Sequence, residues 1–154
     1  MKRWCDFAEA EPEMAEAARK LIYQYGIGLG YLATVRRDGA PRLHPICLIQ
    51  AGDGLYAFIV PSPKRADLDR DGRVAVHACG PDDRDDEFAI TGRAVPVTDA
   101  VARAAALASY ETSGGKSNDA EVCYEFLLES ALVASYKKRG EPDNWPPQYR
   151  KWRA

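Results

Sequence analysis

The sequence predicts a small domain of the α+β class, built mainly from β-strands that form a barrel. Five short segments are rich in apolar and β-branched residues and are separated by turns that contain glycine or proline. These segments are residues 29–35, 42–50, 55–60, 73–79 and 88–97. Helical patterns precede the first segment and follow the fifth. Many short strands with one inserted helix are typical of a small barrel.

The composition fits one soluble domain that spans residues 1–154. The chain has a mass of 17.0 kDa and is 46% hydrophobic, which is enough to bury a core without disulfides or a structural metal. Its 21 Lys and Arg against 23 Asp and Glu exclude a general nucleic-acid binder, because such binding needs many phosphate-neutralising cations. No apolar run approaches the length of a membrane span, and no apolar signal segment follows the first residues. We therefore expect a cytoplasmic protein that contacts neither membrane nor nucleic acid.

The first half is expected to contain one helix and then a run of strands. Residues 11–25 have the apolar spacing of an amphipathic helix, with Pro12 suited to the first turn and Gly26 to the end. A turn at Asp38-Gly39 joins the first two strands, and the third follows directly, so we predict an antiparallel meander. Residues 66–71 are expected to form a short helix.

The second half is less regular. Gly92 is expected to mark a bulge or a close approach within the fifth strand. Thr98 is expected to cap an alanine-rich helix that extends to residue 110. Residues 123–136 fit either a helix or a final hairpin. Residues 140–154 contain three prolines and are expected to form an extended tail over a surface.

Few residues have a pattern that indicates chemistry by itself. The cysteines are scattered without a Cys-x-x-Cys pair, and neither His44 nor His77 has metal-ligand spacing, so we expect reduced thiols and no metal site. Ser62 lacks the glycine-flanked turn of a hydrolase nucleophile. However, Ser62, Lys64 and Arg65 place a hydroxyl and two cations in one turn after a strand. This turn either binds a phosphate monoester or is a solvated basic turn.

Short motifs follow one another in a fixed order along the predicted strands. They are Leu32-Ala33-Thr34-Val35, Asp38-Gly39, Pro41, Pro45, Gly54-Leu55-Tyr56, Phe58, Ser62, Lys64, Leu68, Asp71 and Arg73-Val74-Ala75-Val76. This ordered series resembles the pyridoxamine 5'-phosphate oxidase-like family of FMN-binding split barrels. The match is best over residues 28–97 and weaker at both ends.

This resemblance implies a six-stranded antiparallel split barrel with an N-terminal helix and an inserted helix. It also implies a homodimer with FMN in each of two clefts at the subunit interface. The isoalloxazine ring of FMN would lie along residues 45–47. Residues 58–60 would line the ring and the ribityl chain, and the phosphate would lie at the turn of Ser62, Lys64 and Arg65. The implied cofactor-binding residues are Pro45, Ile46, Cys47, Phe58, Ile59, Val60, Ser62, Lys64 and Arg65.

Two further residues have an open role. His44 alternates with Pro45 on the second strand and either donates a hydrogen bond to flavin or substrate or is a structural histidine. Trp145 either covers the flavin of the partner subunit or packs on the barrel. Neither pattern identifies a catalytic residue.

The function implied by the resemblance is a flavoprotein oxidoreductase that transfers a hydride or two electrons to or from a small molecule. A deazaflavin-dependent reductase and a non-catalytic flavin- or haem-binding protein are the alternatives; for haem, His44 or His77 is a candidate axial ligand. Oxidation of pyridoxamine phosphate itself is not expected. Pro63 stands where oxidising members have a further arginine, and no histidine follows His77 to contact that substrate.

Overall fold

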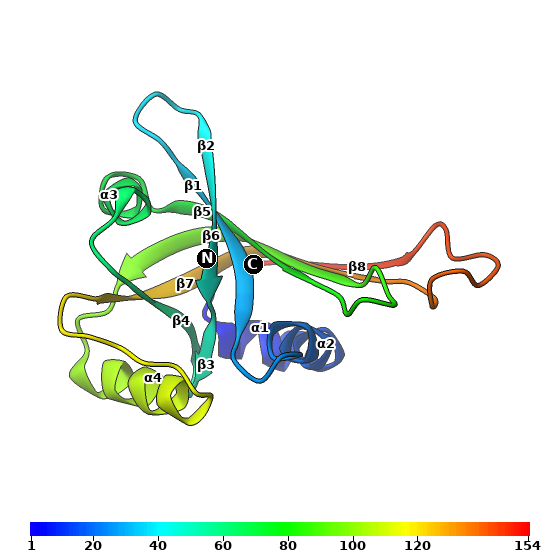
Figure 1. Ribbon diagram of the computed structural model, residues 1–154, viewed down its shortest axis with the longest axis horizontal. Helices are drawn as coiled ribbons and strands as arrows, with labels where there is room; N and C mark the ends of the chain where they lie inside the picture. Colours follow the sequence, from blue (N-terminus) through cyan, green and yellow to red (C-terminus); the bar gives the residue numbers. More distant parts are fainter.

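An antiparallel sheet that curls on itself forms the body of the molecule, and four helices flank it (Figure 1). The computed structural model describes the whole chain, residues 1–154. The helices are α1 Trp4–Ala10, α2 Pro12–Ile22, α3 Pro63–Arg70 and α4 Ala100–Thr112. The strands are β1 Leu29–Val35, β2 Pro41–Cys47, β3 Ile49–Ala51, β4 Gly54–Ile59, β5 Arg73–Cys79, β6 Glu87–Pro96, β7 Val122–Ser135 and β8 Gln148–Arg153. None of the helices has both the length and the hydropathy that a bilayer span requires.

The strand order confirms the predicted antiparallel pairs but not one continuous meander. The sheet runs β2-β1-β5-β6-β7-β4-β3, and β8 pairs with β7. The start of the predicted second strand pairs with β1 and its end, β3, pairs with β4, but β2 and β3 lie at opposite ends of the strand order. The predicted strand 42–50 is split at Leu48, whose side chain is buried and whose N–H donates to the carbonyl of Gly28 at 3.1 Å. This break directs the chain from β2 into β3, at the other end of the sheet order.

One long strand replaces the predicted helix or hairpin at residues 123–136. Strand β7 pairs with β6 along nearly its whole length, and with β4 and β8 on its other edge. A side chain at Gly92 would meet the Leu127 carbonyl oxygen at 1.9 Å, and the β6–β7 register shifts between Thr91 and Gly92, as the sequence predicted.

The C-terminal tail is more regular than predicted. Its prolines precede β8, so they do not prevent the last residues from adding a strand to the sheet. Strands β3 and β8 bring the total to eight, where six were expected. In Figure 1, β8 and the neighbouring loops extend away from the helices, while the β1–β2 hairpin projects in another direction.

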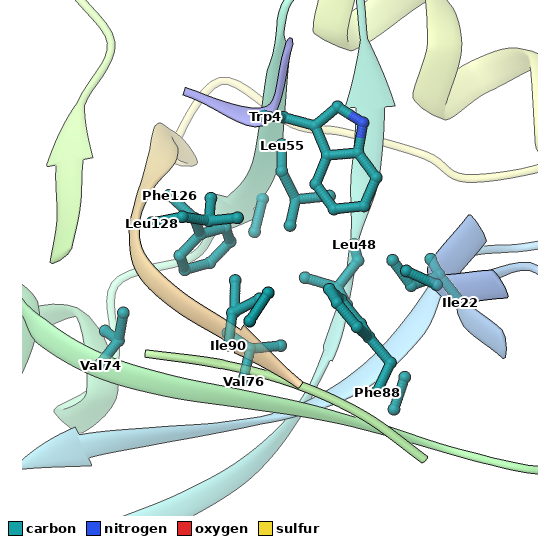
Figure 2. Packing of buried hydrophobic residues seen from close by; sticks show 14 of the residues in the cluster. Trp4, Ile22, Leu48, Leu55, Val74, Val76, Phe88, Ile90, Phe126 and Leu128 are labelled. Atoms are coloured by element: carbon teal, nitrogen blue, oxygen red, sulfur yellow. The ribbon is translucent and has the colours of Figure 1, made fainter. Parts of the chain in front are cut away.

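The core lies between the concave side of the sheet and the α1–α2 pair. Helix α2 was predicted, with ends at 11 and 25, but α1 was not, because its seven residues contain only two large apolar side chains. Those two, Trp4 and Phe7, are buried and pack edge-on against each other at 5.3 Å between ring centroids. Trp4 also packs against Phe88 of β6 (Figure 2). The first helix therefore closes one end of the core.

Helix α3 lies against β1 and contributes Leu68 to this core, whereas α4 packs in a second, smaller cluster. Helix α3 begins three residues before its predicted start, because Ser62 caps it and Pro63 suits its first position. Helix α4 lies against β3 and β4 through the buried Ala106. Its cap is Asp99, not the predicted Thr98, since the Asp99 carboxylate accepts from the Val101 N–H at 2.8 Å.

Candidate cofactor-binding cleft

A cleft of about 340 Å³ opens where β2 and β4 lie near each other without a hydrogen-bonded ladder. Strand β2 is the last strand at its end of the sheet, so the backbone groups on its outer edge have no strand partner. Pro45, which has no N–H to donate, is compatible with such an edge. The lining residues are Leu29, Pro45, Ile46, Cys47, Phe58, Ile59, Val60, Lys64, Tyr110 and Glu121.

Two apolar walls form most of the cleft. The β2 wall carries Ile46, which is buried, and Cys47, which is half-buried. On the β4 wall the ring of Phe58 stacks on Tyr110 of α4, with 5.9 Å between centroids and 20° between planes. The Arg103 guanidinium lies 5.6 Å from the Phe58 centroid, a cation–π contact. Phe58 is thus held in place from outside the cleft.

Positive charge gathers at one end of the cleft, at the start of α3. The Lys64 ammonium donates to the Pro45 carbonyl at 3.3 Å and so reaches from α3 to β2. The Ser62 hydroxyl donates to the Val60 carbonyl at 2.9 Å and accepts from the Arg65 N–H at 3.4 Å. The first turn of α3 contains no acidic residue. Cations at a helix N-terminus oppose the helix dipole, so this arrangement favours a bound anion.

The Arg65 side chain turns away from Lys64. Its guanidinium donates to the Ala120 carbonyl at 2.9 Å and lies 4.0 Å from the Asp69 carboxylate, and it does not line the cleft. Its backbone N–H belongs to the capping turn, whereas its charge holds the loop before β7 against α3. Of these three predicted residues only Lys64 lines the cleft, whereas Ser62 caps α3 beside it and Arg65 supports the turn from outside.

His44 lies on the inner side of β2 near Lys64, Arg42 and Asp67, and it does not line the cleft as was predicted. Its Nε2 atom is buried and has no hydrogen-bond partner within the chain. Burial and the nearby positive charges of Lys64 and Arg42 hold the pKa of His44 below its ordinary value. The imidazole is therefore neutral at pH 7, and one polar atom near the basic turn is left without a partner.

Three lining residues were not singled out in the sequence: Leu29, Tyr110 and Glu121. The sequence could have indicated Tyr110, since it is the one aromatic residue in the alanine-rich helix α4. Burial, together with the neighbouring Cys47 and Glu121, raises the pKa of Tyr110 to about 12, so its hydroxyl stays protonated. No pattern marked Glu121, which belongs to the loop before β7.

Two residues considered for ligand contacts lie elsewhere. Trp145 is 72% exposed and packs against Tyr136, 6.3 Å between centroids, in the segment between β7 and β8. His77 lies on the outer side of β5, with its Nε2 3.0 Å from a Glu87 carboxylate oxygen. Within one chain neither residue lines the cleft.

Solved structures share this fold at low sequence identity. A conserved hypothetical protein from Mycobacterium tuberculosis matches with a TM-score of 0.64 and 21% identity over 74% of this chain and 81% of its own. A NimC/NimA family protein from Clostridium acetobutylicum matches with a TM-score of 0.63 and 17% identity over 90% of this chain and 93% of its own. HutZ, the haem storage protein from Vibrio cholerae, matches with a TM-score of 0.58 and 16% identity over 77% and 89%. At these identities the likeness concerns the fold alone.

The family is settled by the sequence itself. No curated protein matches the chain. The family model described as pyridoxamine 5'-phosphate oxidase matches residues 14–126, which include α2, both walls of the cleft and the basic turn. The chain therefore belongs to the pyridoxamine 5'-phosphate oxidase-like family.

Proposed function

We propose that this protein binds FMN in the cleft between β2 and β4 and is an oxidoreductase that acts on a small molecule. The observation that carries the proposal is the combination of an apolar slot with a cationic helix N-terminus at one end. A flavin mononucleotide has a planar apolar ring at one end and a phosphate at the other. The two ends of the cleft match these two chemistries.

The residues of the cleft fit the cofactor in three respects. Aliphatic side chains of Ile46, Ile59 and Val60 supply flat apolar walls. The free edge of β2 offers backbone groups to the polar rim of a ring. The ammonium of Lys64 supplies a charged donor at the basic turn. When bound, FMN supplies the hydride or two-electron chemistry that the side chains alone do not provide.

The chain's own residues position the ligands and exclude water. Phe58 and Tyr110 close one side of the cleft, and the protonated Tyr110 hydroxyl is available as a hydrogen-bond donor to a substrate. Pro63, at the position where oxidising members have a further arginine, argues against pyridoxamine phosphate as that substrate. We infer a different small molecule that binds in the cleft beside the flavin.

We also propose a homodimer in which a second copy covers this open side. Leu29 and Pro45 line the cleft and continue into the outer face of the β1–β2 hairpin, where Tyr31 and Leu43 are exposed. An apolar face of this kind beside a ligand site is typical of an interface.

A titration of the purified protein with FMN tests the cofactor assignment. Replacing Lys64 by alanine is expected to weaken FMN binding by about 1.5–3 kcal/mol, the scale of a charged hydrogen bond, or roughly ten- to 150-fold in Kd. The matched control is Lys20→Ala on α2, an exposed lysine that does not line the cleft. Quenching of flavin fluorescence gives both affinities. Equal affinities of wild type and Lys64→Ala would overturn the phosphate site.

The same titration separates the alternatives. A deazaflavin that binds where FMN does not indicates a deazaflavin-dependent reductase. Haem is a second candidate, because HutZ shares the fold and His44 has a ring nitrogen without a partner. A Soret band that appears on haem addition and is lost in His44→Ala would favour haem over flavin.

A further inference from the structure

A cysteine, a histidine and a carboxylate meet on the outer face of the sheet, outside the cleft. His77 and Cys79 are two residues apart on β5 and therefore point to the same side. The β5–β6 register places Glu87 directly opposite Cys79. The Cys79 sulfur lies 3.6 Å from Nδ1 of His77, and Nε2 of His77 lies 3.0 Å from Glu87. Three side chains from two strands thus form a continuous chain of contacts.

The carboxylate determines how the imidazole can act. Glu87 is an acceptor, so Nε2 carries the proton that it receives, and Nδ1 of the neutral ring is left with a lone pair toward the Cys79 thiol. Glu87 is held in turn by the Tyr136 hydroxyl, which donates to its other oxygen at 3.4 Å. A nucleophile, a base and a group that orients the base are the elements of an activated thiol.

A second cavity adjoins this thiol. It has a volume of about 390 Å³ and is lined by His77, Cys79, Glu87 and the acidic loop between β5 and β6, with the guanidinium groups of Arg84 and Arg139. Its lining is almost wholly polar and carries both charge signs. The two guanidinium groups are already paired, Arg84 with Asp86 and Arg139 with Asp85, so the cavity suits a small polar molecule rather than an apolar one.

We propose that Cys79 is a reactive thiol that exchanges with small polar disulfides, with His77 as its base and Glu87 as the positioning residue. The thiol proton passes to Nδ1 of His77, and the thiolate attacks one sulfur of the disulfide. A bond forms between Cys79 and that sulfur while the disulfide bond breaks. The departing thiolate takes the proton from His77, so the protein gains a mixed disulfide and one small thiol is released.

The other cysteines lack these features and serve as internal references. Cys123 is buried, and burial raises its pKa to about 11, which makes it a poor nucleophile. Cys5 and Cys47 are half-buried, and no histidine contact accompanies either of them, whereas Cys79 is exposed. Each of the four cysteines lies on a separate tryptic peptide, so their modification is separable by mass.

The experiment treats the purified protein with L-cystine, a polar disulfide without net charge, and follows each cysteine peptide by mass spectrometry. Because Cys79 borders Leu29, Tyr31 and Pro45 on the face of the proposed dimer, the Leu43→Glu variant, which lacks that contact, is treated in the same way. Cys79 is expected to form the mixed disulfide at least tenfold faster than Cys5 or Cys47. His77→Gln is expected to lower the Cys79 rate by roughly tenfold or more, because the base is lost. Glu87→Gln keeps an acceptor for the imidazole and should give an intermediate rate. Melting temperatures of all variants show whether the fold is intact.

Two results would overturn the proposal. One is a Cys79 rate no higher than that of Cys5 in both the wild type and folded Leu43→Glu, each of which is a comparison within one molecule. The other is an unchanged Cys79 rate in folded His77→Gln. An uncharged disulfide, 4,4'-dithiodipyridine, should show a smaller preference for Cys79 if the charged cavity contributes. Neither reagent involves the cleft or a flavin, so these outcomes are independent of the FMN titration.

Discussion

At the scale of single residues, Asp67 links the β1–β2 hairpin to the helix that carries the basic turn. It is only 3% exposed and accepts from Thr34 at 3.0 Å, from Arg42 at 2.8 Å and from Arg70 at 3.3 Å. Burial by itself would raise its pKa, but the hydrogen bonds from these three residues outweigh burial and hold the pKa below the ordinary 3.8. The carboxylate is therefore charged in the folded protein and fixes α3 beneath the hairpin.

Asp67→Asn is expected to lower the free energy of unfolding at pH 7 by about 3 kcal/mol, because it leaves the two arginines without their buried partner. A lowered pKa in the folded state means that the stabilisation is present above the ordinary pKa and is lost as the pH falls below about 4. Urea unfolding between pH 3 and pH 7 should therefore show the wild type and the variant converging in acid. Asp53→Asn, at an exposed ion pair, should cost less than about 1 kcal/mol. A constant difference between wild type and Asp67→Asn at every pH would contradict this account.

The residues of the cleft show which parts of a site a sequence can reveal. Ser62 and Lys64 were detectable because a hydroxyl and a cation adjoin each other in one turn. Tyr110 and Glu121 join the cleft only through the packing of α4 and of the loop before β7, which no local pattern encodes. Arg65 illustrates the converse: its charge adjoins Lys64 in sequence, but its side chain pairs outside the cleft. Sequence proximity identified the turn but not the direction of each side chain.

At the scale of elements, strand β7 was the hardest to predict and is the most connected. Its propensities fit a helix as well as strands, and only pairing with β6 and β4 on opposite edges resolves that ambiguity. Strand β8 was missed because prolines precede it. By contrast β1 and β5 have the predicted ends, since each is a short apolar run bounded by turn residues. Local pattern therefore predicted the strands with clear boundaries, and long-range pairing determined the rest.

The bulge at Gly92 offers a test of that pairing. Gly92→Ala is expected to destabilise the protein by about 1–3 kcal/mol, because the new methyl group would overlap the Leu127 carbonyl, a backbone atom that cannot move without disturbing the β6–β7 ladder. Thr91→Ala, at the exposed neighbouring position, is the control and should cost less than about 1 kcal/mol, since it removes only a surface contact with Ser130. Equilibrium urea unfolding gives both values. Equal costs at the two positions would show that the close approach at Gly92 does not constrain the sheet.

At the scale of the whole molecule, the curled sheet leaves one apolar face without a partner. On the outer side of the β1–β2 hairpin, Ala33 lies opposite Leu43 and Tyr31 lies opposite Pro45, so their side chains form one surface. Leu43 is 65% exposed there. On the inner side of the same hairpin, Leu32 and Ile46 pack in the core, and Thr34 and Arg42 donate hydrogen bonds to Asp67. A second copy seated on the outer face would bury these side chains and cover the adjoining cleft.

Leu43→Glu is therefore expected to convert the proposed dimer into a monomer. Burying the leucine in an interface contributes about 1.5–3 kcal/mol per subunit, and a glutamate at the same place would have to lose its hydration without a defined cationic partner. Sedimentation velocity at micromolar concentration measures the change in mass. The matched control is Val101→Glu on α4, because Val101 is 78% exposed and lies away from the hairpin. A mass unchanged by Leu43→Glu, or a dimer broken equally by Val101→Glu, would place the subunit contact elsewhere.

The same variant tests whether the partner subunit contributes to the cofactor site. If the FMN affinity falls together with the dimer in Leu43→Glu, the second copy contributes to the cleft. If the affinity is unchanged, one chain suffices to hold the cofactor.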